Sequence, residues 1–142
     1  DFFCQSANVP DVTMPVTEVA RRFRNLPIIP GGGVTFGDFS VTFLVDEDLV
    51  NYNSIYKWIR DNGNADEMLR KTSDDDMYTD GQLLILTSQF NPAFIVDFKQ
   101  LFPIGLTGLQ FDARMSDAEY MTATVTFKHQ QFFLRDKNNR LL

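Results

Sequence analysis

The stretch from Val34 to Gly63 constrains the fold most strongly, because its apolar residues change their spacing within one run of sequence. In the first half they occupy alternate positions, which is typical of a strand with one apolar face. These alternating residues are Phe39, Val41, Phe43 and Val45. In the second half the spacing becomes helical, and the residues that share it are Leu49, Tyr52, Ile55, Tyr56, Trp58 and Ile59. The sequence therefore predicts a strand followed by an amphipathic helix near residues 48–61.

Three carboxylates, Asp46, Glu47 and Asp48, separate the predicted strand from the predicted helix. A helix N-terminus carries unpaired N–H groups and a partial positive charge, so we expect Asp46 or Asp48 to cap it. Gly63 suits the position after the last turn, where the backbone often adopts positive φ. We interpret this strand and helix as the packing hub of the fold. The residues expected to build the hub are Phe43, Val45, Tyr52, Trp58 and Ile59.

Length and charge limit the classes of protein that this chain fits. A chain of 142 residues is expected to form a single domain, residues 1–142, with a substantial core. Its net charge of −6 argues against a surface that grips nucleic acid, because phosphate binding requires basic residues. The same charge suits a surface past which nucleic acid moves without sticking. The single cysteine, Cys4, excludes an internal disulfide and favours a reducing compartment.

The sequence contains no evident membrane span or signal peptide, since its longest unbroken apolar run covers only residues 83–86. We therefore expect no membrane partner. The chain starts at Asp1, directly in strand-like sequence and without methionine. We expect the precursor to contain residues before this point.

Residues 11–30 form an unusual segment in a region punctuated by four prolines, from Pro10 to Pro30. Proline cannot donate to a β-ladder, which confines such a segment to a sheet edge or an extended arm. Apolar residues alternate near its start, and arginines cluster near its middle. The segment is either an arm or hairpin that reaches away from the core, or an ordinary edge hairpin of the same domain. Its candidate contact residues are Val12, Met14, Val16, Arg21, Arg22 and Phe23.

The rest of the sequence predicts a mainly β protein with the one helix on its flank. Strand-like alternation recurs at 2–9, 39–45, 82–89, 93–99 and 119–134, with 82–89 expected to be buried and 119–134 to be the longest strand. Residues 102–105 interrupt the pattern, residues 63–81 are typical of a long acidic surface loop, and the tail from Arg135 is predicted to fray. About six strands joined by short turns favour a β-sandwich or rolled antiparallel sheet.

No catalytic, metal or cofactor signature emerges from the sequence. His129 is the only histidine, no G-x-S-x-G motif accompanies it, and no His/Cys set has zinc spacing. We expect His129 to be structural. A Cys4–His129 pair would require their two strands to be neighbours, which the spacing allows but does not indicate. The carboxylates at 46–48 could also act in acid–base catalysis or bind a metal ion, but capping explains them without either role, and we favour it.

Several motifs, taken in order, make the chain resemble the tail tube protein family of contractile-tailed bacteriophages, which includes tube subunits and the tube initiators of the baseplate. The matching passages are FFCQSANVP from Phe2 to Pro10, FSVTFLVDEDLVNYNSIYKW from Phe39 to Trp58, LFPIGLTGLQFD from Leu101 to Asp112, and the alternating strand at 119–134. Together they cover most of the chain.

The resemblance implies a structural virion protein rather than an enzyme, with no cofactor. In the family, six subunits join their sheets into a ring with an inner β-barrel, and rings stack into a tube through which DNA and proteins pass. The implied partners are further copies in stacked hexameric rings, other tail tube, sheath or baseplate proteins, and DNA in transit without specific binding. The implied location is the phage tail, assembled in the host cytoplasm.

The resemblance also places residues 11–30 where a hairpin reaches neighbouring subunits, and we expect residues 82–98 and 119–134 to form the lumenal sheet. Three alternatives stay open. The abundance of aromatic residues, including 14 phenylalanines, also fits a monomeric β-sandwich that binds carbohydrate. A small hydrolase that uses Asp46, Glu47 or Asp48 is the other class. Within the family, the sequence does not separate a tube subunit from an initiator or a terminator ring.

Overall fold

The computed structural model describes residues 4–30, 33–63, 77–111 and 121–142. The strands in this part of the chain are β1 (Cys4–Ala7), β2 (Val12–Thr13), β3 (Val16–Arg21), β4 (Arg24–Pro30), β5 (Thr35–Phe36), β6 (Phe39–Leu44), β7 (Thr79–Leu86), β8 (Pro92–Leu106), β9 (Thr122–Lys128) and β10 (Gln131–Asp136), and the helix is α1 (Val50–Gly63). All pairings are antiparallel. The prediction of a mainly β fold with a rolled antiparallel sheet and one flanking helix is confirmed.

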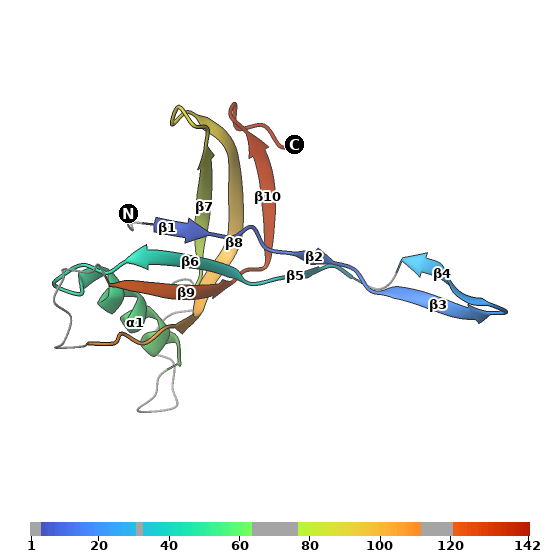
Figure 1. Cartoon of the computed structure of the whole chain (residues 1–142), viewed down its shortest axis with the longest axis horizontal. Helices are drawn as coiled ribbons and strands as arrows, with labels where there is room; N and C mark the ends of the chain where they lie inside the picture. The colour runs from blue at the N-terminus through green and yellow to red at the C-terminus, as the bar shows by residue number, and fades with distance from the viewer. Residues whose placement is uncertain (1–3, 31–32, 64–76, 112–120) are drawn as a thin grey trace.

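One long strand, β8, connects two differently directed parts of a six-stranded sheet. Its first half pairs with β7 and β10, and its second half pairs with β9, which pairs in turn with β6 and then β1. The backbone of Gln100, between the two halves, has φ of 52°. Figure 1 shows the result: β7, β8 and β10 rise together across the direction of β1, β6 and β9. The sheet therefore curls around its own apolar face.

The core lies inside this curl, where the two parts of the sheet face each other. Phe43 and Val96 are fully buried, and Phe98 is 1% exposed. The rings of Phe39 and Phe98 stack with their centroids 4.2 Å apart, which joins β6 to β8 across the curl. Helix α1 adds the buried Ile55 to this cluster. Since buried apolar surface contributes about 25 cal/mol per Å², these large side chains hold the two parts of the sheet together.

Helix α1 is fixed to the end of β6 by the side chain of Asn51, which is 8% exposed. Its Nδ2 donates to the carbonyl of Leu44 at 2.7 Å, and its Oδ1 accepts from the backbone nitrogens of Asp46 and Tyr52 at 3.2 and 2.8 Å. The helix begins at Val50, two residues later than predicted, because Leu49 takes positive φ of 55° and delays the first turn. The main chain of Asp46 accepts from Leu49 in this turn, so side-chain capping by Asp46 or Asp48 stays a prediction.

The residues named as the hub lie at the junction of β6, α1 and the core. Phe43 is fully buried. The other four are partly buried and pack against the core: Val45, Tyr52, Trp58 and Ile59. Trp58 approaches Phe127 with a centroid distance of 6.3 Å, and the hydroxyl of Tyr52 donates to the carbonyl of Thr107 at 3.1 Å. These contacts brace the sheet with the helix.

Several strand predictions were wrong in detail. Residues 119–134 are not one strand: the described part divides into β9 and β10 at His129 and Gln130, where the chain passes from one part of the sheet to the other. Residues 102–105 do not interrupt the pattern but belong to β8, the longest strand. Strand β7 is half-buried rather than buried, with Leu84 and Leu86 50% and 47% exposed.

The predicted acidic loop at 63–81 falls mostly outside the described residues, which resume at Met77. Its last residues were wrongly assigned, because strand β7 already begins at Thr79. Within the described residues, no helix is long and apolar enough to cross a bilayer.

Candidate assembly surfaces

The segment from Val12 to Pro30 forms an arm that leaves the main sheet. Strand β2 pairs with β5 at its base, and β3 and β4 form a separate two-stranded sheet farther out. Figure 1 shows this hairpin projecting from the body at one end of the longest axis. Every residue of β3 is exposed. The arm therefore gains little stability from the core of its own chain.

The outer arm is a two-stranded hairpin, which is only marginally stable alone in water, and the arm exposes apolar side chains. Val12, Met14 and Val16 are 56%, 48% and 49% exposed along its length. At the tip, Phe23 is 95% exposed and has φ of 81°, and the guanidinium carbon of Arg22 lies 5.3 Å from its ring centroid. Arg21 and Arg22 are exposed beside it. An apolar stem with a basic, aromatic tip is typical of a contact surface.

The sheet of β7, β8 and β10 has two outer edges. Strands β7 and β10 both run antiparallel to β8 and therefore run parallel to each other. Within the described residues, the edge of β7 that faces away from β8 pairs with no strand. Unpaired strand edges present rows of N–H and C=O groups that can pair with another chain. We refer to the two outer edges of this sheet as the β7 edge and the β10 edge.

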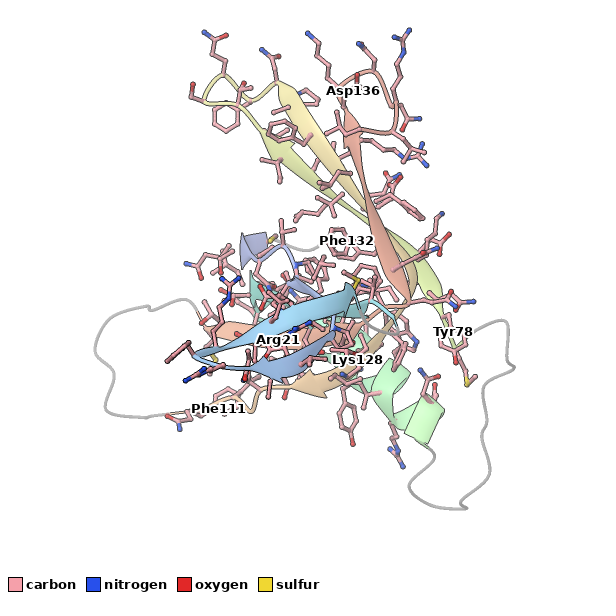
Figure 2. The ribbon with its side chains drawn as sticks, turned by 90° about the vertical axis from the view of Figure 1, so that its right-hand side faces the viewer. Arg21, Tyr78, Phe111, Lys128, Phe132 and Asp136 are labelled. Atoms are coloured by element: carbon pink, nitrogen blue, oxygen red, sulfur yellow. The ribbon has the colours of Figure 1, made fainter. Side chains whose placement is uncertain are left out.

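The upper part of this sheet extends beyond the core and remains apolar. Figure 2 shows β7, β8 and β10 rising away from the body toward the labelled Asp136, with side chains on both faces. The exposed apolar side chains here are Leu84, Leu86, Phe94 and Leu134, which are 50%, 47%, 50% and 43% exposed. Exposed apolar residues gathered on one small sheet indicate an interaction surface rather than scattered surface hydrophobics.

Two ion pairs of different character cross this sheet. Asp97 of β8 is 4% exposed and pairs with Arg135 of β10. Lys99 pairs with Asp80 at 3.0 Å near the surface. The hydrogen bond from Lys99, followed by that from the backbone nitrogen of Gln100, lowers the pKa of Asp80 below its ordinary value. The buried pair fixes the position of β10 against β8, since an unpaired buried charge is costly.

His129 lies at the bend between β9 and β10 and packs among aromatic rings. It contacts Phe36, Phe98 and Phe132 with centroid distances of 5.8, 5.2 and 5.8 Å, and its Nε2 lies 3.1 Å from the carbonyl of Gly37. Burial lowers its pKa, partly offset by the hydrogen bond to Gly37. This position supports the structural role expected for His129.

The described residues do not assemble a catalytic or metal centre. Cys4 is exposed on β1, which pairs only with β6 within the described sheet, so it does not form the pair with His129 that catalysis would need. Glu47 and Asp48 are exposed in the turn before α1 and Asp46 is half-buried there. No group of three His, Cys, Asp or Glu side chains in the described ranges is arranged to hold a metal ion.

A cavity of about 510 Å³ opens between β1, β6 and α1 on one side and β7 on the other. Its lining is mostly the apolar core, including Phe43, Trp58 and Phe98, with Thr79, Asp80 and Gln82 of β7 beside it. Because Phe43 and Phe98 are 0% and 1% exposed, these rings offer no open aromatic platform to a sugar, and the cavity adds no support to the carbohydrate-binding alternative.

Sequence reasoning missed the β7 and β10 edges and the Asp97–Arg135 pair. The only signal for the pair was a charged residue in each of two apolar runs, IVDF at 95–98 and FFLR at 132–135. The sequence did predict the candidate contact residues of the arm, but their exposure is a consequence of the way the hairpin projects from the body.

Comparison with known proteins gives a family and a fold. A family model described as phage tail tube protein matches residues 1–135. A chain of the anti-feeding prophage baseplate, determined with 6-fold symmetry, has a TM-score of 0.67 and 13% identity, with 96% of this chain and 82% of that chain covered. A chain of the sheath–tube complex of the PVC extracellular contractile injection system has a TM-score of 0.63 and 14% identity, covering 94% and 80%.

The Hcp1 protein from the E. coli EAEC 042 pathovar has a TM-score of 0.56 and 9% identity, covering 96% of this chain and 76% of that chain. At such identities the likeness establishes the fold alone. No curated protein matches the sequence significantly.

Proposed function

This chain belongs to the phage tail tube protein family, and from that premise we propose that it is a ring-forming subunit of a bacteriophage tail tube or of the baseplate-proximal ring that initiates the tube. Membership of this family supports a structural role in a phage tail tube. Beyond that role, we propose the ring, the channel and the contacts between copies.

The observation that carries the proposal is the pair of outer edges on the β7–β8–β10 sheet. These edges belong to opposite sides of one sheet, so pairing the β7 edge of one copy with the β10 edge of the next makes a head-to-tail contact. Head-to-tail contacts generate rings when the rotation between copies closes. Because β7 and β10 run parallel, the pairing between rotated copies is parallel.

In this arrangement the joined sheets form the inner wall of the ring. The face that carries Val96 and Phe98 is occupied by the core, so the opposite face, with Asp80, Gln82 and Lys99, lines the channel. Asp80 and Lys99 pair with each other on this face, so their charges offset and give phosphate no unpaired cation to bind, and the net charge of −6 over the whole chain does not favour DNA binding either. A hexameric ring is the proposed stoichiometry, in line with the 6-fold symmetry of the anti-feeding prophage baseplate.

The arm supplies the second contact between copies. Its exposed apolar stem and the tip around Phe23 are proposed to pack on a neighbouring subunit, in the same ring or in the next one. Burial there offsets the marginal stability of a lone hairpin. Sheath and baseplate proteins of the same tail are the further partners, and the assembled particle is a phage tail.

Negative-stain electron microscopy of the purified protein tests the proposal. Rings with a central channel, alone or stacked into tubes, are the expected result at high protein concentration. A chain that stays monomeric across concentration, salt and pH refutes it.

A further inference from the structure

The residues that follow β10 fold back along the outer edge of that strand. We call residues 137–142 the return segment. The backbone nitrogen of Leu142 donates to the carbonyl of Leu134 at 3.1 Å, and that of Asp136 donates to the carbonyl of Arg140 at 2.9 Å. Arg135 and Leu141 form a bridge between the two. The return segment therefore occupies the β10 edge, including backbone groups that a strand from another copy would need. The predicted fraying of the tail from Arg135 stays a prediction.

Polar contacts rather than apolar burial hold the return segment in place. Oδ1 of Asp136 accepts from the backbone nitrogens of Asn138 and Arg140, both at 2.9 Å. Arg135 donates to Oδ1 of Asn139 at 3.3 Å, and Asn139 takes φ of 63°, a conformation that asparagine tolerates.

The apolar residues of the return segment are not buried. Leu141 and Leu142 remain 64% and 75% exposed. A segment tied by a few exposed hydrogen bonds belongs to the least stable part of a fold and opens readily.

The return segment also lies outside the part of the chain that matches the family. The family match ends at residue 135, so it includes nearly all of β10 and excludes the segment that covers its edge. The β10 edge thus lies almost entirely within the matched residues, whereas the segment that covers it lies beyond them.

We propose that the return segment masks the β10 edge of the free subunit and must be displaced before the β7 edge of a second copy pairs there. This inference rests on the proposed ring function. The carbonyl of Leu134 and the backbone nitrogen of Asp136 already have partners in the free chain, so the masked and the paired states compete for the same groups. Only subunits whose return segment is displaced can join a neighbour at the β10 edge. The apparent affinity between subunits is therefore reduced in proportion to the fraction of subunits in that state. The mask thereby delays ring formation and protects a bare edge from unspecific pairing.

The test compares two full-length variants with the native chain. Asp136→Ala removes the acceptor that shapes the return segment, and Asp61→Ala, on the exposed surface of α1, is the matched control for loss of one carboxylate. Sedimentation velocity gives the concentration at which rings first form. We expect Asp136→Ala to lower that concentration on the order of tenfold, and Asp61→Ala to leave it unchanged.

A lock provides the opposite perturbation. Leu134 and Leu142 lie opposite each other next to the Arg135–Leu141 bridge, and the Cα spacing of opposed antiparallel residues suits a disulfide. In a Cys4→Ser background, Leu134→Cys with Leu142→Cys closes the mask when oxidised. We expect no rings from the oxidised protein and rings from the same protein after reduction.

The outcomes separate the inference from the function on which it rests. Rings from the native chain, earlier rings from Asp136→Ala, and none from the oxidised lock support the mask. Rings that form equally in all of these proteins overturn the mask and leave the ring function standing. The absence of rings in every protein, including the reduced lock, refutes the ring function and the mask together.

Discussion

Replacing Arg135 with methionine is expected to destabilise the folded chain strongly, because the change leaves the Asp97 carboxylate buried without its cation. Asp97 is 4% exposed, and the side chain of Arg135 is 28% exposed where the two meet. Removing one partner of a buried ion pair costs about 3–5 kcal/mol. Domains typically unfold with about 5–15 kcal/mol, so this single change removes a large share of the total.

The double variant Asp97→Val with Arg135→Met is expected to regain most of that loss. Replacing both charges with apolar groups removes the desolvation penalty, and such exchanges are often neutral or stabilising by about 1–4 kcal/mol. The matched control is Lys99→Met, which breaks the nearby ion pair with Asp80 at the surface. Its side chains are 41% and 61% exposed, so we expect a loss of less than about 1 kcal/mol.

Urea denaturation followed by the fluorescence of Trp58, the single tryptophan, measures these differences at concentrations where the chain is monomeric. The reasoning is refuted if Arg135→Met loses less than about 1 kcal/mol. It is also refuted if the double variant is as unstable as the single one, because the loss would then not arise from an uncompensated charge.

Three further predictions address the helix, the bend and the arm. Asn51→Ala is expected to cost about 1–3 kcal/mol in urea denaturation, because it leaves polar backbone groups unpaired at the end of β6; a loss near zero contradicts the bracing role. Since burial lowers the pKa of His129 from 6.5, its contribution to stability is complete above pH 6.5 and is lost as the pH falls through the folded-state pKa. His129→Gln should therefore flatten the stability–pH curve just below pH 6.5, where Asp38 and Lys128 are the neighbouring charges, and an unchanged curve contradicts this. Phe23→Ser should leave the melting temperature of the monomer unchanged, because Phe23 is 95% exposed, but should weaken the assembly of rings or tubes measured by sedimentation. Assembly equal to that of the native chain contradicts a contact at the tip of the arm.

The core strands were predictable because each has one face fully committed to the interior. In β6 the buried Phe39 and Phe43 flank the partly buried Val41, and in β9 Val125 and Phe127 are buried at alternate positions, as the period of two requires. The helix was predictable for the same reason, since Ile55 and its neighbours recur at the spacing that places them on one face. The spacing of apolar residues predicts a strand or a helix well when that element buries only one of its faces.

The bend between the two parts of the sheet shifts the apolar alternation by one position. In β8 the buried residues are Val96 and Phe98 before the bend and Leu101 after it, and the buried Phe127 of β9 is followed by Phe132 of β10, which packs against the core. Residues 119–134 were predicted as one strand because each half alternates on its own, and a shift of one position does not by itself indicate a change of direction. The change of direction depends on the backbone near Gln100 and on packing across the curl, which a pattern of residue types does not encode.

The assembly surfaces were predictable only in part. Prolines and alternating apolar residues indicated an arm at 11–30, because proline is excluded from the middle of a sheet. The two edges of the β7–β8–β10 sheet and the return segment are set by the order of the strands in the sheet. Asp97 and Arg135 come together only because β10 pairs with β8, although they are far apart in the sequence. Such contacts between distant residues follow from topology rather than from local sequence.

Electron cryomicroscopy of the assembled protein tests the central claim most directly, because it places each strand of one subunit beside its neighbour. The account predicts a closed ring in which the β7 edge of each copy continues the sheet at the β10 edge of the next, with the return segment moved away from Leu134. A ring in which both edges remain exposed, or in which the copies meet through other surfaces alone, would contradict it.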